Sequence, residues 1–175
     1  MKNLDQEKIL ISAENIIRQK GLEKTTMTDI AKSLGVTHAA LYKHYKNKNE
    51  LLEQLALNWL HDTSKQLFNF TPKTSDPKKN LYDFLWLLTS SKKKHYQEDP
   101  QMFTLYTNYI ENNPSLVKKH LKDLSMKINE LTGENNGTAI LTAFSYFHNP
   151  YFASRWNNDN HKELFNQVFS LINQY

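Results

Sequence analysis

Apolar positions in the first seventy residues repeat at helical spacing. Between residues 4 and 20, apolar side chains recur at intervals of three and four and would share one face of a helix: Ile9, Ala13, Ile16 and Ile17. The first seventy residues contain no proline, and their only glycines are Gly21 and Gly35. Because glycine tolerates the left-handed backbone at a helix end, the pattern predicts helices interrupted at these two points.

Two short helices are predicted on either side of Gly35. Thr26 and Asp29 have the spacing of a capping box and would open a helix that ends before Gly35. Gly35 provides the positive φ that a sharp turn requires. Thr37 would then cap a third helix, residues 38–45. Two helices joined by a glycine turn form a helix-turn-helix unit.

The rest of the chain also has helical periodicity. Asn47 would cap a fourth helix that ends near residue 70, and residues 69–80 have the composition of a linker. Pro150 should end or kink the penultimate helix near Phe147. Further helices are expected at 81–97, 101–113, 115–131, 138–148 and 161–174. With no alternating strand pattern, we predict an all-α fold of about nine helices, with a helix-turn-helix domain at 1–47 and a larger helical domain at 48–175.

Composition excludes several classes of protein. The 175 residues are 39% hydrophobic and 23% charged and include no cysteine, which favours a globular chain without disulfides or thiolate metal sites. No segment approaches the roughly 18 apolar residues of a membrane span. The amino terminus has acidic residues among its apolar ones, unlike a signal peptide. We therefore expect a cytoplasmic protein without a membrane partner.

Positive charge is concentrated on the predicted helix-turn-helix unit. The formal net charge of the chain is +4, and residues 28–48 alone carry four lysines against one aspartate, or +3. His38 and His44 lie in the same segment. A basic helix-turn-helix unit is typical of nucleic-acid binding. A second basic run, KKKH at residues 92–95, is expected to be a solvated helix end.

The same segment resembles a known family. Its residues stand in the order and spacing of the DNA-binding region of the tetracycline-repressor (TetR) family of bacterial transcription regulators: Thr26, Asp29, Ile30, Ala31, Gly35, Val36, Leu41, Tyr42, His44, Lys48 and Leu51. The resemblance covers about residues 8 to 52. It implies that the chain binds a double-stranded DNA operator and regulates transcription.

The third helix would enter the major groove of the operator. Apolar residues such as Ile30, Ala31 and Leu41 would hold the two helices together, and the exposed side chains would face DNA: His38, Ala39, Ala40, Lys43 and His44. The two alanines allow close approach and contact with thymine methyl groups.

Other side chains of the unit are suited to phosphate oxygens. Tyr42, His44 and Lys48 can donate hydrogen bonds to phosphate whichever base is present. Thr26, Thr28 and Thr37 can do the same, although each threonine can equally be a plain helix cap. Tyr45 is expected in the core with its hydroxyl at the rim.

The family resemblance also implies a ligand cavity and a dimer. Candidates for contact with a small apolar or aromatic ligand are Trp59, Trp86, Tyr106 and Phe147, each of which can instead be simple packing. The last two helices would pair with those of a second copy through Ile140, Phe144, Leu164, Phe165, Val168, Phe169 and Ile172. Two-fold symmetry would then place two reading helices over a near-palindromic site.

The predicted function is that of a ligand-responsive regulator, most simply a repressor released from its operator by a small molecule. The alternative is an architectural or interaction protein that uses the same DNA contacts but responds to a protein partner. An enzyme is not expected, because no nucleophile elbow, phosphate-binding loop or carboxylate pair is present. Among the histidines at 61, 95, 120, 148 and 161, none has the spacing of a metal site, so no metal or cofactor is predicted. His148 should cap the end of its own helix.

Overall fold

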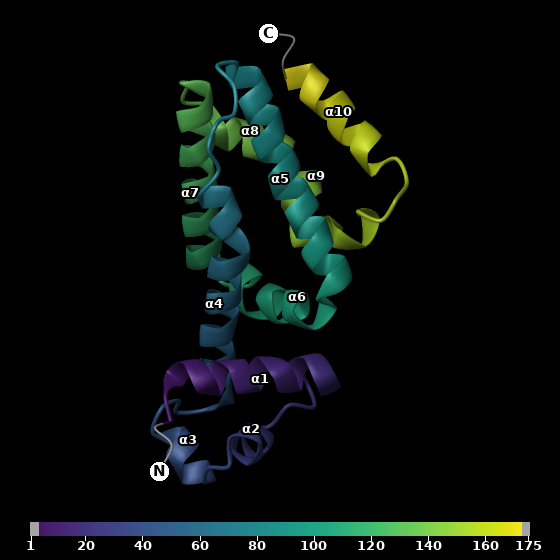
Figure 1. The fold of residues 1–175 in the computed structure, drawn as a ribbon. Helices are drawn as coiled ribbons and strands as arrows, with labels where there is room; N and C mark the ends of the chain where they lie inside the picture. Colours follow the sequence, from purple (N-terminus) through teal and green to yellow (C-terminus); the bar gives the residue numbers. More distant parts are fainter. Residues whose placement is uncertain (1–3, 173–175) are drawn as a thin grey trace. The chain divides into compact units, whose positions relative to one another are not determined.

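The computed structural model describes residues 4–172, and these form helices and connecting loops without a β-strand, which confirms the all-α prediction. Residues 173 and 174 of the last predicted helix lie outside the described range. The helices in Figure 1 are α1 (Gln6–Lys20), α2 (Met27–Leu34), α3 (His38–Tyr42), α4 (Lys48–Phe68), α5 (Pro77–Glu98), α6 (Pro100–Tyr106), the π-helix η1 (Thr107–Glu111), α7 (Pro114–Thr132), α8 (Gly137–Ala143), α9 (Ser145–His148), the 3-10 helix η2 (Pro150–Arg155) and α10 (His161–Ile172).

The described chain divides into two compact units. The first contains the residues up to Asp62 together with Asp99–Asn112, and the second contains Thr63–Glu98 and the residues from Asn113 onward. Helix α4 contributes its first part to one unit and its last turns to the other. The domain boundary expected after residue 47 stays a prediction.

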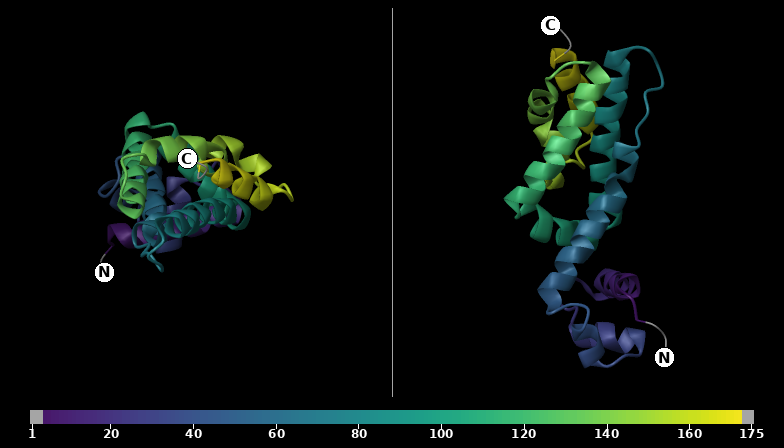
Figure 2. Two further views of the ribbon diagram at one scale, coloured as in Figure 1. Left: turned by 90° about the horizontal axis from the view of Figure 1, so that it is seen from above. Right: turned by 90° about the vertical axis from the view of Figure 1, so that its left-hand side faces the viewer.

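The first unit is built around α1. This helix packs against α2 and α6, and α2 packs against α3, with α2 and α3 on the same side of α1 (Figures 1 and 2). Most apolar positions predicted to face inward are buried, among them Ile9, Ala13, Ile17, Ile30 and Leu41, whereas Ile16 is half-buried. Burial of one aliphatic side chain of this size contributes about 1.5 to 3 kcal/mol. The Arg18 guanidinium bonds the Asp99 carboxylate at 2.7 Å and so joins α1 to the start of α6.

The second unit has an aromatic core. Helix α5 packs against α7 and α9, and α7 packs against α8 (Figure 2). Phe165 of α10 lies at the centre of a group of rings in edge-to-face or tilted contact, with Phe144 at 5.2 Å and Phe147 at 5.4 Å between ring centroids. Such pairs add roughly 0.5 to 1.5 kcal/mol each beyond the area that they bury. Among the described residues, no helix has the length and apolarity needed to cross a membrane.

The predicted boundary between the linker and the next helix is wrong. The linker expected at 69–80 ends earlier, because Pro77 occupies the first position of α5, where proline fits without losing a hydrogen bond. The Asp76 carboxylate accepts from the backbone N–H of Lys78 at 2.9 Å and caps this start. The buried Asn80 side chain then donates to the Thr74 carbonyl at 2.8 Å, which orders the loop before it.

The helix expected at 138–148 is divided into α8 and α9. Phe144 lies between them with φ −92° and ψ 8°, outside the helical region, and α9 ends at His148 as the position of Pro150 predicts. His148 does not cap its own helix. Its Nε2 hydrogen-bonds the carbonyl of Leu141 at 3.0 Å, in the last turn of α8, because the chain folds back between the two helices.

Candidate nucleic-acid interface

The capping box at the start of α2 is formed as the sequence predicts. The Thr26 hydroxyl accepts from the Asp29 N–H at 3.2 Å, and the Asp29 carboxylate accepts from the Thr26 N–H at 2.9 Å. Lys20 at the end of α1 forms an ion pair with the same carboxylate. The hydrogen bond from Lys20, followed by that from Thr26, lowers the pKa of Asp29 to about 2. These bonds fix where α2 starts relative to α1.

Gly35 makes the turn between α2 and α3. Its φ of 65° and ψ of 32° are left-handed, and its N–H donates to the Lys32 carbonyl at 3.1 Å. The Val36 N–H donates to the Ala31 carbonyl at 3.0 Å, which closes the end of α2. Ala31 and Leu41 are buried where the two helices meet. The turn thereby holds α3 against α2 as in a helix-turn-helix unit.

Helix α3 is shorter than predicted. The Thr37 hydroxyl accepts from the Ala40 N–H at 3.2 Å and caps its start, as the sequence predicts. The helix ends at Tyr42 instead of Tyr45, because the chain tightens into a turn in which the His44 N–H donates to the Leu41 carbonyl at 3.0 Å. Helix α3 is therefore little more than one turn long.

The outer face of α3 presents hydrogen-bond donors and small side chains. His38, Ala39, Tyr42 and Lys43 are exposed, whereas Ala40 is half-buried. Tyr42 has 42% of its surface exposed, and its ring meets that of His38 edge-on at 4.7 Å. No acidic residue occurs on α3. The small alanine side chains allow DNA to approach the helix closely. Beside them, the His38 imidazole, the Tyr42 phenol and the Lys43 ammonium group can donate hydrogen bonds to DNA.

Lys48 lies at the first position of α4 and is half-buried. Its ammonium group donates to the Leu22 carbonyl at 3.3 Å, so it is attached to the loop between α1 and α2. An ammonium group has three N–H donors, and this bond uses one of them. The predicted phosphate contact is therefore compatible with a structural bond that the sequence did not reveal.

The remaining predicted contact residues lie in the same unit. Thr28 is exposed on α2, and His44 is half-buried after α3. Thr26 is exposed, but its hydroxyl also donates to Asp29, so both hydrogen-bonding roles of that hydroxyl are used within the capping box. The predicted DNA contacts thus belong to one compact unit. Of the two threonines at the start of α2, Thr28 has the hydroxyl that is more available to a phosphate, because that of Thr26 is used in the capping box.

The expectation for Tyr45 is wrong in one respect. The ring is in the core, with 4% of the residue exposed, but the hydroxyl is buried as well and has no hydrogen-bond partner among the described residues. Burial raises the pKa of this phenol. The sequence could not show the depth of the hydroxyl, because that depth depends on how the following helix packs.

The four predicted ligand-contact residues are divided between the two units. Trp59 and Tyr106 lie in the first unit, with ring centroids 5.6 Å apart, and the buried Tyr106 hydroxyl donates to the Glu111 carboxylate. Burial raises the pKa of Tyr106 well above its usual value. Phe147 is part of the aromatic core of the second unit, and Trp86 lines a pocket on that unit. Of the four residues, Trp86 lines a described pocket, and the ligand-contact role of all four stays a prediction.

The predicted dimer residues differ in exposure. Ile140, Phe144 and Phe165 are buried within their own unit. Half-buried positions are Leu164, Val168, Phe169 and Ile172. Leu171, which the sequence analysis missed, has 61% of its surface exposed and follows Leu164 and Val168 at intervals of four and three. This spacing on α10 was the available signal, because it places the three side chains on one helix face.

Comparison with known families identifies the chain. The model for bacterial regulatory proteins of the tetR family matches residues 9–55, and the model for the tetracyclin repressor-like C-terminal domain matches residues 77–169. The chain belongs to the TetR family. The resemblance drawn from the sequence is confirmed, and TetR-family relatives are transcriptional regulators, not enzymes.

Individual relatives of this TetR-family regulator match it to different extents. The HTH-type transcriptional regulator TtgR of Pseudomonas putida is 42% identical over 59 residues, which are 34% of this chain and 28% of TtgR. The Staphylococcus aureus protein IcaR, a negative transcriptional regulator of the biofilm operon icaADBC, is 25% identical over 183 residues, covering 96% of this chain and 97% of IcaR. The chain thus spans little more than a quarter of TtgR and nearly all of IcaR.

A solved structure shares the whole fold. The crystal structure of BioQ with its natural double-stranded DNA operator superposes with a TM-score of 0.60 at 16% identity, over 99% of this chain and 100% of BioQ. Similarity at this level of identity establishes the fold of the TetR-family chain. Both the helix-turn-helix unit and the helical second unit therefore have counterparts in the family.

Proposed function

We propose that this TetR-family regulator is a repressor that binds a near-palindromic operator as a homodimer. The observation that carries the proposal is the outer face of α3, where exposed donors and small side chains lie on a capped helix without an acidic residue. A full-length relative, IcaR, is named a negative regulator, which supports repression.

Contacts with bases and with phosphates are assigned to different side chains. His38, Ala39 and Ala40 occupy the first turn of α3, which reaches base edges when a helix of this kind enters the major groove. Tyr42 and Lys48 lie further along, with Thr28 and Thr37 near the helix starts, where phosphate oxygens pass. Lys43, expected among the base-reading side chains, follows the last residue of α3 and is assigned to phosphate with them. Thr26 and His44 complete the predicted set as weaker contacts. The first group would determine sequence preference and the second would position the protein.

The dimer is proposed to form through α8 and α10. Leu164, Val168 and Leu171 form an apolar stripe on α10, in which Leu164 and Val168 are half-buried against the core of their own unit and Leu171 has 61% of its surface exposed. The same stripe on a second copy would cover it in a two-fold arrangement. Two reading helices would then lie about 34 to 36 Å apart, one helical turn of DNA.

Regulation is proposed to come from a small molecule bound in the helical part of the chain, residues 48–175. A ligand that binds more tightly to a form with wrongly spaced reading helices shifts the population away from DNA. A shift from almost fully bound to almost fully released requires roughly a 10⁴-fold difference in affinity between the two forms. Trp86 is the candidate contact residue that lines a described pocket.

The direct test is selection of duplexes from a random pool, followed by fluorescence anisotropy on the enriched sequence. Replacing Ala39 or Ala40 by glutamine should change which duplex is enriched, because a longer side chain meets different base edges. Replacing Lys118, an exposed lysine of α7 in the second unit, by glutamine should leave the enriched sequence unchanged. If no duplex is enriched, or if the alanine variants select the same duplex as the natural chain, the assignment of α3 as the reading helix is wrong.

A further inference from the structure

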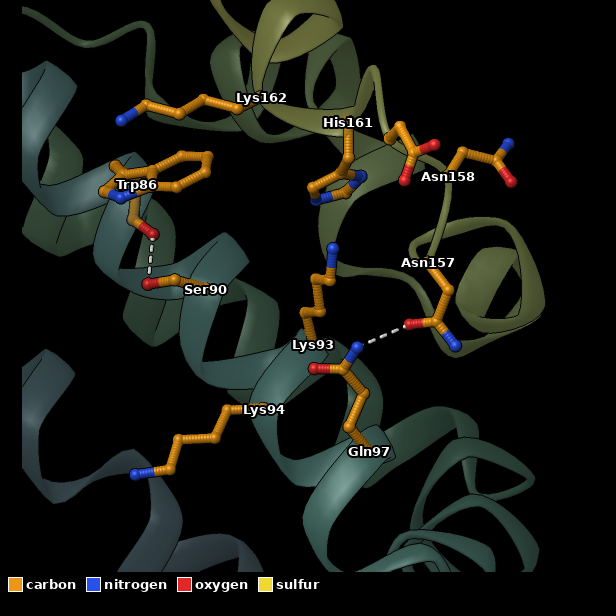
Figure 3. Close-up of a pocket in the computed structure, with 10 residues that line it drawn as sticks. Trp86, Ser90, Lys93, Lys94, Gln97, Asn157, Asn158, His161 and Lys162 are labelled. Atoms are coloured by element: carbon orange, nitrogen blue, oxygen red, sulfur yellow. Dashed lines mark hydrogen bonds between the residues drawn. The ribbon is translucent and has the colours of Figure 1, made fainter.

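A pocket of 440 Å³ lies on the second unit between α5 and the start of α10 (Figure 3). Trp86, Lys93 and Lys94 line it from α5, and His161 and Lys162 line it from α10. Its volume is in the range of small-molecule sites. The residues that connect η2 to α10 close another side, where the Gln97 amide donates to Asn157 at 2.8 Å.

The lining of this pocket is strongly cationic. The lining contains three lysines, at positions 93, 94 and 162, and one carboxylate, Asp159, for a formal excess of two positive charges. Lys94 lies 3.8 Å from Glu98, outside the pocket lining, so part of its charge is balanced. Neither Lys93 nor Lys162 forms an ion pair with another described residue. Like charges held around one cavity repel one another, and an anion between them removes that repulsion.

The two unpaired lysines line the pocket from different helices. The Lys162 ammonium lies 5.1 Å from the centre of the Trp86 ring, and Figure 3 shows it above that ring. Lys93 extends toward His161 in the same view. The Ser90 hydroxyl donates to the Trp86 carbonyl at 2.6 Å within α5. The two ammonium groups therefore belong to one pocket lining and come from two helices, one over Trp86 and one beside His161.

His161 gives independent support for a ligand. Only 4% of this residue is exposed, and neither of its ring nitrogens has a hydrogen-bond partner among the described residues. Buried polar atoms without partners are uncommon, and a bound molecule is one way in which they become satisfied. Burial, and then the Lys93 ammonium, lower the pKa of His161. Because α10 begins at His161, the positive end of its helix dipole also lies at the pocket.

We propose that this pocket binds a small molecule with two or more carboxylate or phosphate groups, held by Lys93, Lys162 and His161. The run at residues 92–95 is then more than a solvated helix end, since Lys93 is half-buried and faces the pocket. An anion bound there bonds α5 to α10 and makes their contact tighter. An effect of this anion on the affinity for DNA rests on the proposed function. The binding of the anion to the pocket does not depend on that function.

Isothermal titration calorimetry of the full chain at low ionic strength and pH 7 tests the proposal, with citrate and inorganic pyrophosphate as probes. Saturable binding of one anion per chain is expected for at least one probe, and the probe that binds more tightly distinguishes carboxylate from phosphate chemistry. Lys93→Gln and Lys162→Gln should each weaken binding about tenfold, the loss of one charge-assisted hydrogen bond. Both lysines are at the protein surface, so these variants are expected to fold.

Lys118→Gln is the matched control, because it removes the same charge from an exposed position on α7 outside the pocket. It should change the dissociation constant less than twofold. The absence of saturable heat with both probes would overturn the proposal, as would equal weakening by Lys118→Gln. Anisotropy on the selected duplex is measured separately, so that failure of DNA binding and failure of anion binding are distinguished.

Discussion

Tyr42 combines two functions that a single substitution can separate. Its ring packs edge-on against His38, and its hydroxyl extends from an exposed position at the end of α3. Tyr42→Phe keeps the ring contact and removes the hydroxyl. If the hydroxyl donates to a phosphate, affinity should fall about tenfold on the selected duplex and by the same factor on a scrambled one. Anisotropy on the two duplexes measures both values, and a loss confined to the selected duplex would show that Tyr42 reads a base.

Two histidines, the half-buried His120 and the buried His148, make stability depend on pH. Burial, followed by the charges of Lys92 and His148, lowers the pKa of His120 to about 3, and burial lowers that of His148 to about 4. Because these pKa values lie below the usual 6.5, the unfolded chain binds more protons than the folded chain at any pH between the folded pKa and 6.5. The contribution of these histidines to the free energy of unfolding is therefore complete above pH 6.5. It falls as the pH decreases toward 4, by up to about 1.4 kcal/mol per pH unit for each histidine.

Chemical denaturation between pH 4 and 7 measures this dependence. His120→Gln should reduce the slope by up to about 1.4 kcal/mol per pH unit, since one fewer proton is taken up on unfolding. His61→Gln is the control, because the His61 side chain is 74% exposed. Equal slopes for the natural chain and His120→Gln would contradict the burial of His120 as a neutral group.

Residue roles could be predicted where they depend on neighbours in the sequence. The capping bonds of Thr26 and Thr37 were predicted because each joins residues three apart. The buried hydroxyl of Tyr45 and the unpartnered ring of His161 could not be predicted, because both result from contacts between helices that are distant in the sequence.

At the scale of elements, Gly137 determines how closely α8 approaches α7. A Cβ atom built at this position would lie 2.2 Å from the Ser125 carbonyl oxygen, which is backbone and cannot rotate away. Gly137→Ala should therefore cost about 3 kcal/mol or more, the upper end of overpacking effects. Gly133→Ala is the comparison. Its site has a φ of 71° and no atom within 4 Å of the new Cβ, so it should cost about 1 kcal/mol of backbone strain.

Thermal unfolding of the two glycine variants provides the measurement. Gly137→Ala should unfold at a clearly lower temperature than Gly133→Ala. Equal losses would mean that α8 can move away from α7 at little cost.

The positions of most helices follow from local signals, whereas their ends do not. Gly35 and the threonine caps located α2 and α3 in the sequence. Helix α5 starts at Pro77, inside the predicted linker, because proline at a first helical position looks the same in sequence as proline in a loop. The break at Phe144 depends on the packing of α8 against α7, which no single segment specifies.

At the scale of the whole molecule, the exposed stripe on α10 predicts a dimer that one charge should disrupt. Leu171→Glu places a carboxylate in the proposed interface, where it would be buried without a partner at a cost of several kcal/mol. Sedimentation should show a dimer for the natural chain and mostly monomer for the variant. Met126→Glu is the control, because Met126 is 58% exposed on α7, outside the proposed interface. Dissociation by both variants, or by neither, would contradict the placement of the interface on α10.

The family of the molecule could be predicted from the segment between Thr26 and Leu51, because its caps, turn glycine and core spacing are all local. The all-α class could be predicted from the helical periodicity of the whole chain. The anion pocket could not be predicted, since Lys93 and Lys162 are nearly seventy positions apart and only the fold brings them to one cavity. Candidate ligand residues chosen for aromatic character were therefore divided between two units.

The affinity for the selected duplex as a function of salt concentration tests DNA binding by α3 most directly. The logarithm of the association constant should fall linearly with the logarithm of salt concentration, and Lys43→Gln should reduce that slope by about one unit, because one fewer phosphate is neutralised. Lys118→Gln should leave the slope unchanged. An affinity that does not depend on salt, or a Lys43→Gln slope equal to that of the natural chain, would contradict DNA binding through this face of α3.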